Sequence, residues 1–223
     1  MKQSLKSKGP KRIWRKIKKT FRQLFSRFYT SGNSYYDSNP EGAKKKIDAQ
    51  KNTWEQFFDY TPEMTSRIRK MLSLIEDRNV HSLMDLGCGR QECGKILADE
   101  ISYYPVDLHR HLPDTIVKDL NAGEFLEIPV DVIFCSGVLE YIYDLDTLLK
   151  KFACFGKSVL CSYCDTDSTP NRASVWVNHL SHLDFVLLFQ RNGFALTQEI
   201  EPSDEPIHIY YFENQNNKHI TTP

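Results

Sequence analysis

The sequence lacks the features of a membrane-spanning or secreted protein. It contains no run of about 18 apolar residues that could cross a membrane as a helix. Its basic N-terminus lacks both the apolar stretch of about 7–15 residues and the small-residue cleavage site of a secretory signal. We therefore expect a cytoplasmic protein.

Cysteines are also too few for a disulfide framework, since only six occur among 223 residues. Cys161 and Cys164 form a CxxC pair, but a zinc site would need a second pair at ligand spacing in a loop or extended segment. Cys88 and Cys93 lie instead on the approach to an expected helix. We expect reduced, buried thiols and predict no metal site.

Acidic residues are absent from the first 30 positions, which hold eleven Lys or Arg. Residues 31–223 hold the other 18 basic residues and all 29 acidic ones, a net charge of −11. A basic arm on an acidic body suggests that the arm contacts a membrane surface or nucleic acid. The length fits one domain with an appendage or two small domains, and the 40% hydrophobic content predicts a folded core.

Residues 11–28 are predicted to form an amphipathic helix. At about 100° per residue, the apolar side chains fall within an arc of about 120°: Ile13, Trp14, Ile17, Phe21, Leu24, Phe25 and Phe28. The opposite side carries eight cations: Lys11, Arg12, Arg15, Lys16, Lys18, Lys19, Arg22 and Arg27. Such a helix is typical of a membrane interface, where the apolar face enters the acyl boundary and the cations meet anionic lipid.

Two other interpretations of residues 11–28 stay open. The apolar stripe could pack on a protein partner or on the body of this chain, or the cations could bind the phosphate backbone of nucleic acid. Aromatic residues confined to one face favour membrane insertion, because base stacking more often interleaves aromatics with the charges. We expect an anionic membrane surface as the partner and disfavour nucleic acid.

The rest of the chain predicts alternating strands and helices. Residues 30–42 have the composition of a loop, and two helices are expected at 43–59 and 63–77, the second capped by Thr61 with Pro62 in its first turn. Strands are expected at 82–86, 102–106, 115–118, 130–135, 158–163, 194–199 and 207–212, and further helices at 92–100, 145–155 and 181–192. This order predicts an α/β, Rossmann-like, doubly wound fold with a mainly parallel seven-stranded sheet and an antiparallel edge, plus the N-terminal amphipathic helix.

Glycines and polar side chains follow four of the expected strands. Gly87 and Gly89 follow the first strand, Asp107 and Asp119 the second and third, and Ser136 the fourth. In such sheets, ligands bind outside the carboxyl ends of the strands, and a carboxylate after the second strand can hold ribose hydroxyls. The sequence therefore predicts a nucleoside-binding crevice, in which Asp119 could accept from the amine of a purine.

The charges of this crevice argue against a dinucleotide. A GxGxxG fingerprint starting at Gly87 would need Gly or Ala at position 92, which is Glu92. Asp85, two residues before the first glycine, adds another negative charge beside the place of a pyrophosphate. A ligand with a cationic end, such as S-adenosylmethionine, fits better.

These segments carry a family resemblance. Residues 83–89 (LMDLGCG) resemble motif I of class I S-adenosylmethionine-dependent methyltransferases, and residues 106–107, 118–121 and 131–142 resemble their later motifs in order and spacing. The resemblance covers about residues 55–213. Together with the charge pattern, the resemblance predicts four parts of the chain: a basic arm (1–30), a linker and capping helix (31–60), a methyltransferase domain (61–215) and a tail (216–223).

The resemblance implies a role for each motif. Ten residues are implied to bind the cofactor: Asp85, Gly87, Cys88, Gly89, Asp107, Leu108, Asp119, Leu120, Cys135 and Ser136. In chain order, the resemblance assigns them to the methionine end, the ribose, the adenine and the transferring methyl. Within this set, Asp107 holds the ribose and Asp119 meets the adenine. Two positions depart from the family pattern, because Gln91 stands where a third glycine is common and Tyr141 where many small-molecule members have His.

The methyl acceptor is predicted from weaker signals. The form VDL…VKDLN…FCSGVLEYI is similar to methyltransferases encoded among bacterial surface-polysaccharide genes. We expect O-methylation of a glycan, a lipid-linked glycan precursor or another small molecule at the cytoplasmic membrane face, with His179, His182 or Tyr141 as candidate bases and Trp54, Tyr60 and Trp176 as candidate pocket walls. A non-catalytic scaffold in a membrane-associated assembly and an RNA methyltransferase are the alternatives.

Overall fold

The computed structural model describes residues 40–56, 60–203 and 205–216. The predicted amphipathic helix, residues 31–39 of the linker and most of the tail lie outside these residues. Within them, no helix is long and apolar enough to cross a membrane.

The core of the fold is one seven-stranded sheet in the order β3-β2-β1-β4-β5-β7-β6. The strands are β1 (Ser82–Leu86), β2 (Ser102–Asp107), β3 (Ile116–Val117), β4 (Val130–Cys135), β5 (Gly156–Tyr163), β6 (Phe194–Ile200) and β7 (His208–Asn214). β1 to β5 are parallel, whereas β7 runs antiparallel to both β5 and β6. The predicted α/β fold with its antiparallel edge is therefore confirmed.

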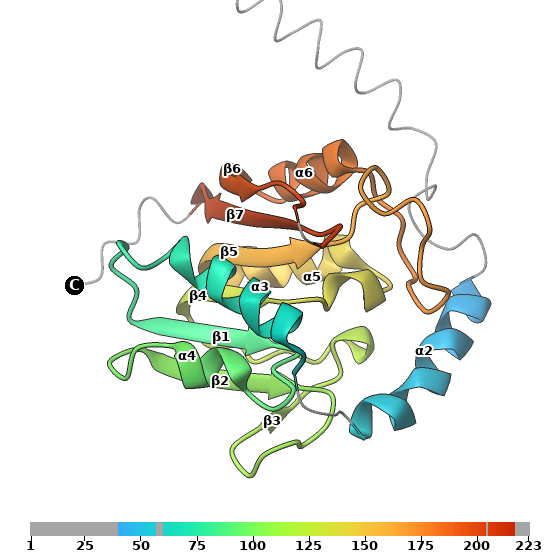
Figure 1. Cartoon of the computed structure of the whole chain (residues 1–223), viewed down its shortest axis with the longest axis horizontal. Coiled ribbons are helices and arrows are strands. Elements are labelled where there is room, and N and C mark those ends of the chain that lie inside the picture. The colour runs from blue at the N-terminus through green and yellow to red at the C-terminus, as the bar shows by residue number, and fades with distance from the viewer. Residues whose placement is uncertain (1–39, 57–59, 204, 217–223) are drawn as a thin grey trace, which may run out of the picture. The chain divides into compact units, whose positions relative to one another are not determined.

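Helices cover both faces of the sheet (Figure 1). α3 (Pro62–Ser73) and α4 (Glu92–Ile96) pack on one face with inward residues such as Leu83 and Phe134. α5 (Leu145–Phe155) and α6 (His182–Arg191) pack on the other face with Met84 and Ile133. Adjacent residues of β1 and of β4 point to opposite faces because side chains alternate along a strand. Each face of the sheet is thus buried, as a parallel sheet requires.

Local sequence signals explain the helix starts. Thr61 caps α3 with its hydroxyl, which accepts from the Met64 amide at 3.3 Å, and Pro62 occupies the first turn as predicted. The loop prediction for 30–42 was wrong at its end, because α2 (Pro40–Glu55) begins at Pro40 with Glu41 in its first turn. Proline early in a helix and a carboxylate near its positive end both favour this start.

Other predicted elements end earlier than expected. α4 stops at Ile96 because Leu97 adopts an extended backbone, and α3 stops at Ser73. β3 is only two residues long. All six cysteines are free, and five are buried, but Cys154 on α5 is exposed, so the expectation of buried thiols was wrong there.

Candidate functional site

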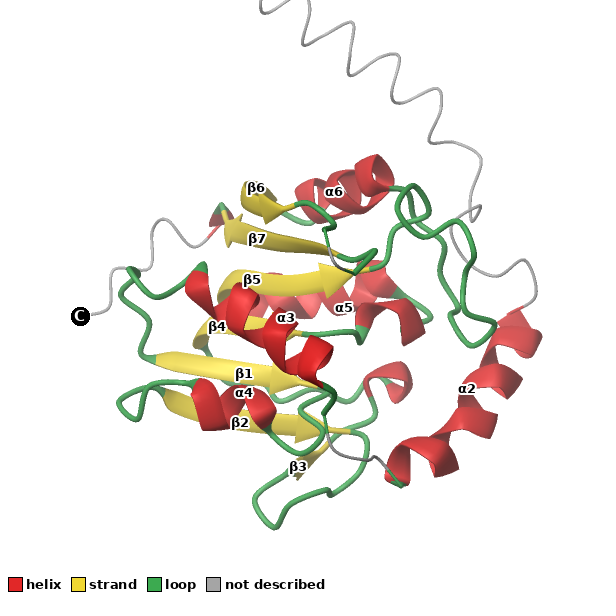
Figure 2. Ribbon diagram, viewed as in Figure 1, coloured by secondary structure: helices red, strands yellow, loops and turns green. Residues whose placement is uncertain are grey.

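A cavity of about 260 Å³ lies at the carboxyl ends of β1, β2 and β4, where α2 also contributes to its wall. In Figure 2 the arrowheads of β1, β2 and β5 point toward the side on which α2 lies. The chain leaves β1 toward β2 and β3 and later returns to β4 on the other side of β1, so the cavity is at the switch point of the sheet.

The cavity brings together most of the residues that the sequence analysis selected. Seven of the ten predicted cofactor residues line it: Gly87, Gly89, Asp107, Leu108, Asp119, Leu120 and Ser136. Tyr141 lines it as well, together with the proposed wall residues Trp54 and Tyr60. Asp85, Cys88 and Cys135 are buried beneath the cavity rather than among its lining residues.

The turn after β1 depends on two glycines. Gly87 has a φ of +74°, and a Cβ there would come within 2.2 Å of Val138 Cγ2, so the turn has no room for a side chain. Gly89 has a φ of +50°, and its amide donates to Asp107 Oδ2 at 2.8 Å. The glycine turn and the carboxylate of the next strand are therefore held in one arrangement.

Gln91 is the only described non-glycine residue with a positive φ, at 59°. This left-handed conformation at the start of α4 is one that glycine adopts without strain. The side-chain nitrogen Nε2 of Gln91 donates to Asp114 Oδ1 at 2.8 Å, and Gln91 is buried. Gln91, at the position where a third glycine is common in the family, therefore has a left-handed backbone, and its side-chain hydrogen bond to Asp114 holds it in place.

Asp107 is both a turn residue and part of the cavity wall. Besides the Gly89 amide, its carboxylate accepts from the His109 amide at 3.1 Å. His111 Nε2 lies 3.5 Å from Asp107 Oδ1, and His111 also lines the cavity. His111 was not among the predicted site residues, although its position four residues after Asp107 was an available signal.

Asp119 connects the end of β3 to α2. Its Oδ1 accepts from the amides of Asn121 and Ala122 at 3.0 and 3.2 Å, which caps the 3-10 helix η1 (Leu120–Ala122). Its Oδ2 accepts from Lys51 Nζ at 2.9 Å. This hydrogen bond raises the pKa of Lys51. Asp119, which was predicted to bind the amine of a purine, is thus held in place by contacts with both η1 and α2.

Asp85 lies in the floor below the glycine turn, with only 3% of its surface exposed. Burial and, to a smaller degree, the charge of Asp107 raise the pKa of Asp85 to about 7, against a hydrogen bond of 2.6 Å from the Tyr103 hydroxyl. Burial likewise raises the pKa of the Cys88 and Cys135 thiols, which keeps both protonated.

Aromatic side chains form the outer wall of the cavity. The rings of Trp54 on α2 and Tyr141 meet edge to face, with centroids 5.0 Å apart. The Tyr60 hydroxyl donates to the Cys88 carbonyl at 2.7 Å. Burial raises the pKa of Tyr141, so its hydroxyl stays protonated at neutral pH. Trp176 is not a lining residue; it stacks instead with the Arg172 guanidinium 4.3 Å from its ring centroid.

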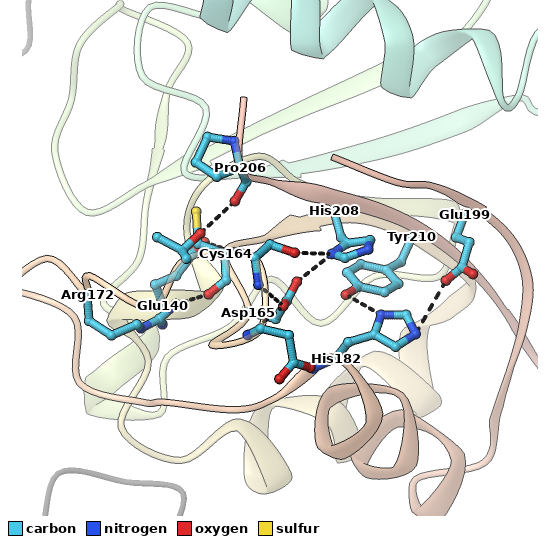
Figure 3. A network of polar contacts seen from close by, with 12 residues as sticks. Glu140, Cys164, Asp165, Arg172, His182, Glu199, Pro206, His208 and Tyr210 are labelled. Atoms are coloured by element: carbon cyan, nitrogen blue, oxygen red, sulfur yellow. Dashed lines mark hydrogen bonds and ion pairs between the residues drawn. The ribbon is translucent and has the colours of Figure 1, made fainter. Parts of the chain in front are cut away.

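The two candidate histidines lie outside the set of lining residues. α6 begins at His182, so His179 precedes the helix and the two do not share a helical face. Figure 3 shows His182 between two groups of the antiparallel edge. Its Nδ1 lies 3.1 Å from the Tyr210 hydroxyl and its Nε2 lies 3.7 Å from Glu199 Oε2.

No family model matches the sequence, and no curated protein is similar to it. Solved structures are similar in fold. Magnesium protoporphyrin IX methyltransferase from Synechocystis PCC 6803, with bound S-adenosylhomocysteine, is 14% identical, with a TM-score of 0.58 over 78% of this chain and 99% of that one. The N-methyltransferase NodS from Bradyrhizobium japonicum WM9, also with S-adenosylhomocysteine, is 12% identical, with a TM-score of 0.59 over 78% and 98%.

A third similar structure has a different reaction in its name. The [4+2]-cyclase SpnF is 9% identical, with a TM-score of 0.57 over 67% of this chain and 80% of that one. The chain therefore has the Rossmann-like fold of S-adenosylmethionine-dependent methyltransferases. At these identities the likeness concerns the fold, and the reaction has to be argued from the site.

Proposed function

We propose that this protein binds S-adenosylmethionine in the 260 Å³ cavity and transfers its methyl group to an acceptor. The observation that carries the proposal is the convergence of Gly87, Gly89, Asp107 and Asp119 on one cavity at the switch point. The two glycines come from the turn after β1, Asp107 from the end of β2 and Asp119 from the turn after β3, and each offers what one part of this ligand needs.

The residues present fit the nucleoside part of the ligand. The two glycines line the cavity without side chains, so the backbone can approach the ligand closely there. Asp107 can accept from ribose hydroxyls, and Asp119 from the adenine amine. Leu108 and Leu120 add apolar surface to the same wall. Glu92 faces away, since it accepts from Thr65 and pairs with Lys95.

When bound, the ligand supplies an electrophilic methyl on a sulfonium. The chain's own contribution is to align the acceptor with that methyl, and alignment can supply roughly 7–11 kcal/mol of a barrier. Ser136 and Tyr141 line the cavity at the end of β4 and beyond it. Because Tyr141 keeps its proton, it can orient an acceptor oxygen by donating a hydrogen bond but is a poor base.

For the acceptor we propose a glycan or lipid-linked glycan precursor, methylated at oxygen on the cytoplasmic face of a membrane. The support is the amphipathic pattern of residues 11–28 and the resemblance of residues 106–142 to polysaccharide-associated methyltransferases. In this structure His182 contacts Tyr210 and does not line the cavity. His179 or His182 can therefore act as the base only if the segment before α6 approaches the cavity.

The test is calorimetric titration of S-adenosylmethionine into the full chain and three variants. Asp107→Ala removes the proposed ribose acceptor, Asp107→Asn keeps one acceptor oxygen, and Asp99→Asn changes an exposed carboxylate in the loop before β2, away from the cavity. We expect micromolar binding, a loss of about 10- to 100-fold for Asp107→Ala, a smaller loss for Asp107→Asn and none for Asp99→Asn.

Two results would change the conclusion in different ways. A folded wild-type chain that does not bind the ligand would refute the cofactor assignment. Binding without methyl transfer to any glycan, lipid-linked glycan or RNA acceptor would favour the scaffold alternative. The second result would also fit a reaction other than methyl transfer, since a protein named for a [4+2] cyclisation has a similar fold.

A further inference from the structure

A second cavity, of about 230 Å³, lies between α3 and the edge formed by β6, β7 and their connection. It is smaller than the 260 Å³ cavity proposed for the cofactor, and no described residue lines both. One side of this smaller cavity comes from α3, which supplies Ser66 and Arg67, and the other from the edge, which supplies Ile207 and Ile209. The fold therefore offers a second, separate space that the proposed cofactor does not fill.

A guanidinium connects the two cavities. Arg67 lines the smaller cavity, and only 10% of its side chain is exposed. Its Nη1 lies 3.3 Å from Glu205 Oε2, and its Nε donates to Ser136 Oγ at 3.2 Å. Ser136 and Gly137 line the larger cavity, and a Cβ on Gly137 would lie 3.7 Å from Arg67 Nη2. The smaller cavity thus adjoins the larger one just after β4, where Gly137 presents no side chain.

The end of β4 has a particular place in the proposed reaction. Ser136 is the last residue of the predicted cofactor set, and the resemblance assigns the end of that set to the transferring methyl. An acceptor atom must be aligned with this methyl from a side that the cofactor itself does not occupy. The smaller cavity adjoins this point, so it has the position of an acceptor site.

Isoleucine side chains form one wall of the smaller cavity. Ile200 pairs with Ile209 across β6 and β7, and Ile207 lies two positions before Ile209. Side chains two positions apart in an extended segment point to the same face of a sheet. All three isoleucines line the cavity. This wall is aliphatic and offers no hydrogen bond, so it favours a ligand with a face of C–H groups.

Polar side chains of two kinds complete the lining. Ser66 and Ser203 have hydroxyls, which can donate or accept, and Glu63 and Glu201 have carboxylates, which accept. All four residues are exposed, so they can exchange water for a ligand. Two cations and three carboxylates line the cavity altogether, so neither an anionic nor a cationic ligand is favoured. The lining therefore favours a neutral ligand that is rich in hydroxyl groups.

We propose that the smaller cavity binds the methyl acceptor as a neutral, polyhydroxylated ring, with one face on the isoleucine wall and one hydroxyl directed past Arg67 toward Ser136. This inference rests on the proposed function, because it places the acceptor beside the proposed cofactor. A pyranose ring has the required chemistry, since one face presents C–H groups and its edge presents hydroxyls that both donate and accept. The glycan proposed above would bind here through the sugar that is methylated.

Methyl NMR can follow both cavities in one sample of the full chain. The δ1 methyls of isoleucine are labelled with ¹³C, and Ile47 reports on the larger cavity while Ile207 and Ile209 report on the smaller one. The three signals are assigned by Ile47→Val, Ile207→Val and Ile209→Val. S-adenosylhomocysteine is added first, and the methyl glycosides of glucose, galactose, mannose and N-acetylglucosamine are then titrated. Methyl glucuronide and methyl glucosaminide serve as matched rings that carry a carboxylate and an ammonium.

Two tryptophan variants test where the glycosides bind. Ser66→Trp puts a large ring at an exposed position in the lining of the smaller cavity. Arg69→Trp is the matched control, because Arg69 is exposed on the same helix and lines neither cavity. Neither position belongs to the proposed cofactor site. The response of Ile47 to S-adenosylhomocysteine should therefore be retained in both variants, which also shows that they are folded.

We expect S-adenosylhomocysteine to shift the Ile47 methyl signal in all three proteins. At least one neutral glycoside should shift the signals of Ile207 and Ile209 in the wild type and in Arg69→Trp, and this shift should be lost in Ser66→Trp. The two charged glycosides should shift these signals less than the neutral ring does.

Three outcomes would overturn the inference. If no neutral glycoside shifted Ile207 and Ile209, or if Ser66→Trp responded like the wild type, the acceptor assignment would be refuted, while the cofactor assignment, measured at Ile47, would stand. A stronger response to either charged glycoside would refute the preference for a neutral ring. If S-adenosylhomocysteine did not shift Ile47 in a folded wild type, the proposed function would fail together with this inference.

Discussion

Single residues in this site combine structural and binding roles. Asp107 fixes the Gly89 amide and the His109 amide, so the carboxylate proposed for the ribose also shapes the turn that surrounds it. Asp85 shows the opposite balance. It is fully enclosed beneath the turn, receives one hydrogen bond from Tyr103 and faces the charge of Asp107. A carboxylate in this position costs stability whenever it is ionised.

The pKa of Asp85 predicts how the stability of the fold depends on pH. In the folded state the pKa is raised from 3.8 to about 7, so between these values the folded chain holds a proton that the unfolded chain does not. The contribution of Asp85 to stability should therefore fall as pH rises from about 4 to 7, and its cost of about a few kcal/mol should be at its full size above pH 7.

Asp85→Asn removes this charge and can still accept from the Tyr103 hydroxyl. We expect the variant to melt several degrees above the wild type at pH 8 and close to it at pH 4. Melting curves across this range check the prediction, with Asp99→Asn at an exposed position as the control. Parallel pH profiles for Asp85→Asn and the wild type would contradict it.

Residue types and their places after the strands could predict much of the candidate site, but they could not predict the hydrogen bonds within it. Gly87, Asp107 and Asp119 could be selected because each follows a predicted strand, and parallel strands bring their carboxyl ends to one edge. The contact of Gln91 with Asp114 could not be predicted, since it depends on the path of two loops. The position of Arg67 beside Ser136 depends on how α3 packs across the sheet, which no local pattern contains.

At the scale of elements, α2 is the part of the site with the weakest sequence signal. Its contacts with the rest of the domain are long-range: Lys51 reaches Asp119, 68 positions away, and Tyr143 donates to the Lys44 carbonyl at 3.3 Å. Ile47 is buried among Val177 and the aromatic rings of the outer wall. Periodicity predicted a helix here, but only tertiary contacts make it part of the cavity wall.

The ion pair between Lys51 and Asp119 should control how often α2 opens. Both side chains are partly exposed, at 33% and 24%, so the pair should contribute only about 0.2–1 kcal/mol. Lys51→Met should therefore make chymotryptic cleavage at Trp54 about 1.4- to fivefold faster, because cleavage follows the population of the open helix. S-adenosylhomocysteine should slow this cleavage in both proteins.

Lys45→Met is the matched control for that experiment, since Lys45 is an exposed cation on the same helix. Its cleavage rate should equal that of the wild type. If Lys51→Met and Lys45→Met were cleaved at the same rate, the pair with Asp119 would have no role in holding α2. Mass spectrometry of the fragments distinguishes cleavage at Trp54 from cleavage elsewhere.

At the scale of the whole molecule, the alternation of strands and helices was sufficient to predict the fold. β1 and β4 have the predicted bounds, and α5 does as well, because a change from period 2 to period 3.6 coincides there with turn residues. Element ends were less predictable where tertiary contacts set them, as at Ile96 of α4. The antiparallel edge followed from the short connection between the last two strands.

The charge division of the chain leads to a prediction about how the molecule is recruited. The first 30 residues hold eleven cations and no acidic residue, whereas the remainder has a net charge of −11 and would be repelled by an anionic surface. The full chain should therefore bind vesicles that contain anionic lipid, bind neutral vesicles much less, and lose binding as salt is raised. Deletion of residues 1–30 should abolish vesicle binding in a sedimentation assay. Affinity for S-adenosylmethionine should stay within about twofold, since the proposed contacts of the ligand, such as Gly87, Asp107 and Asp119, all lie in the domain that remains. Vesicle binding that survived the deletion would assign the contact to the acidic domain, and loss of ligand affinity would mean that the arm takes part in the site.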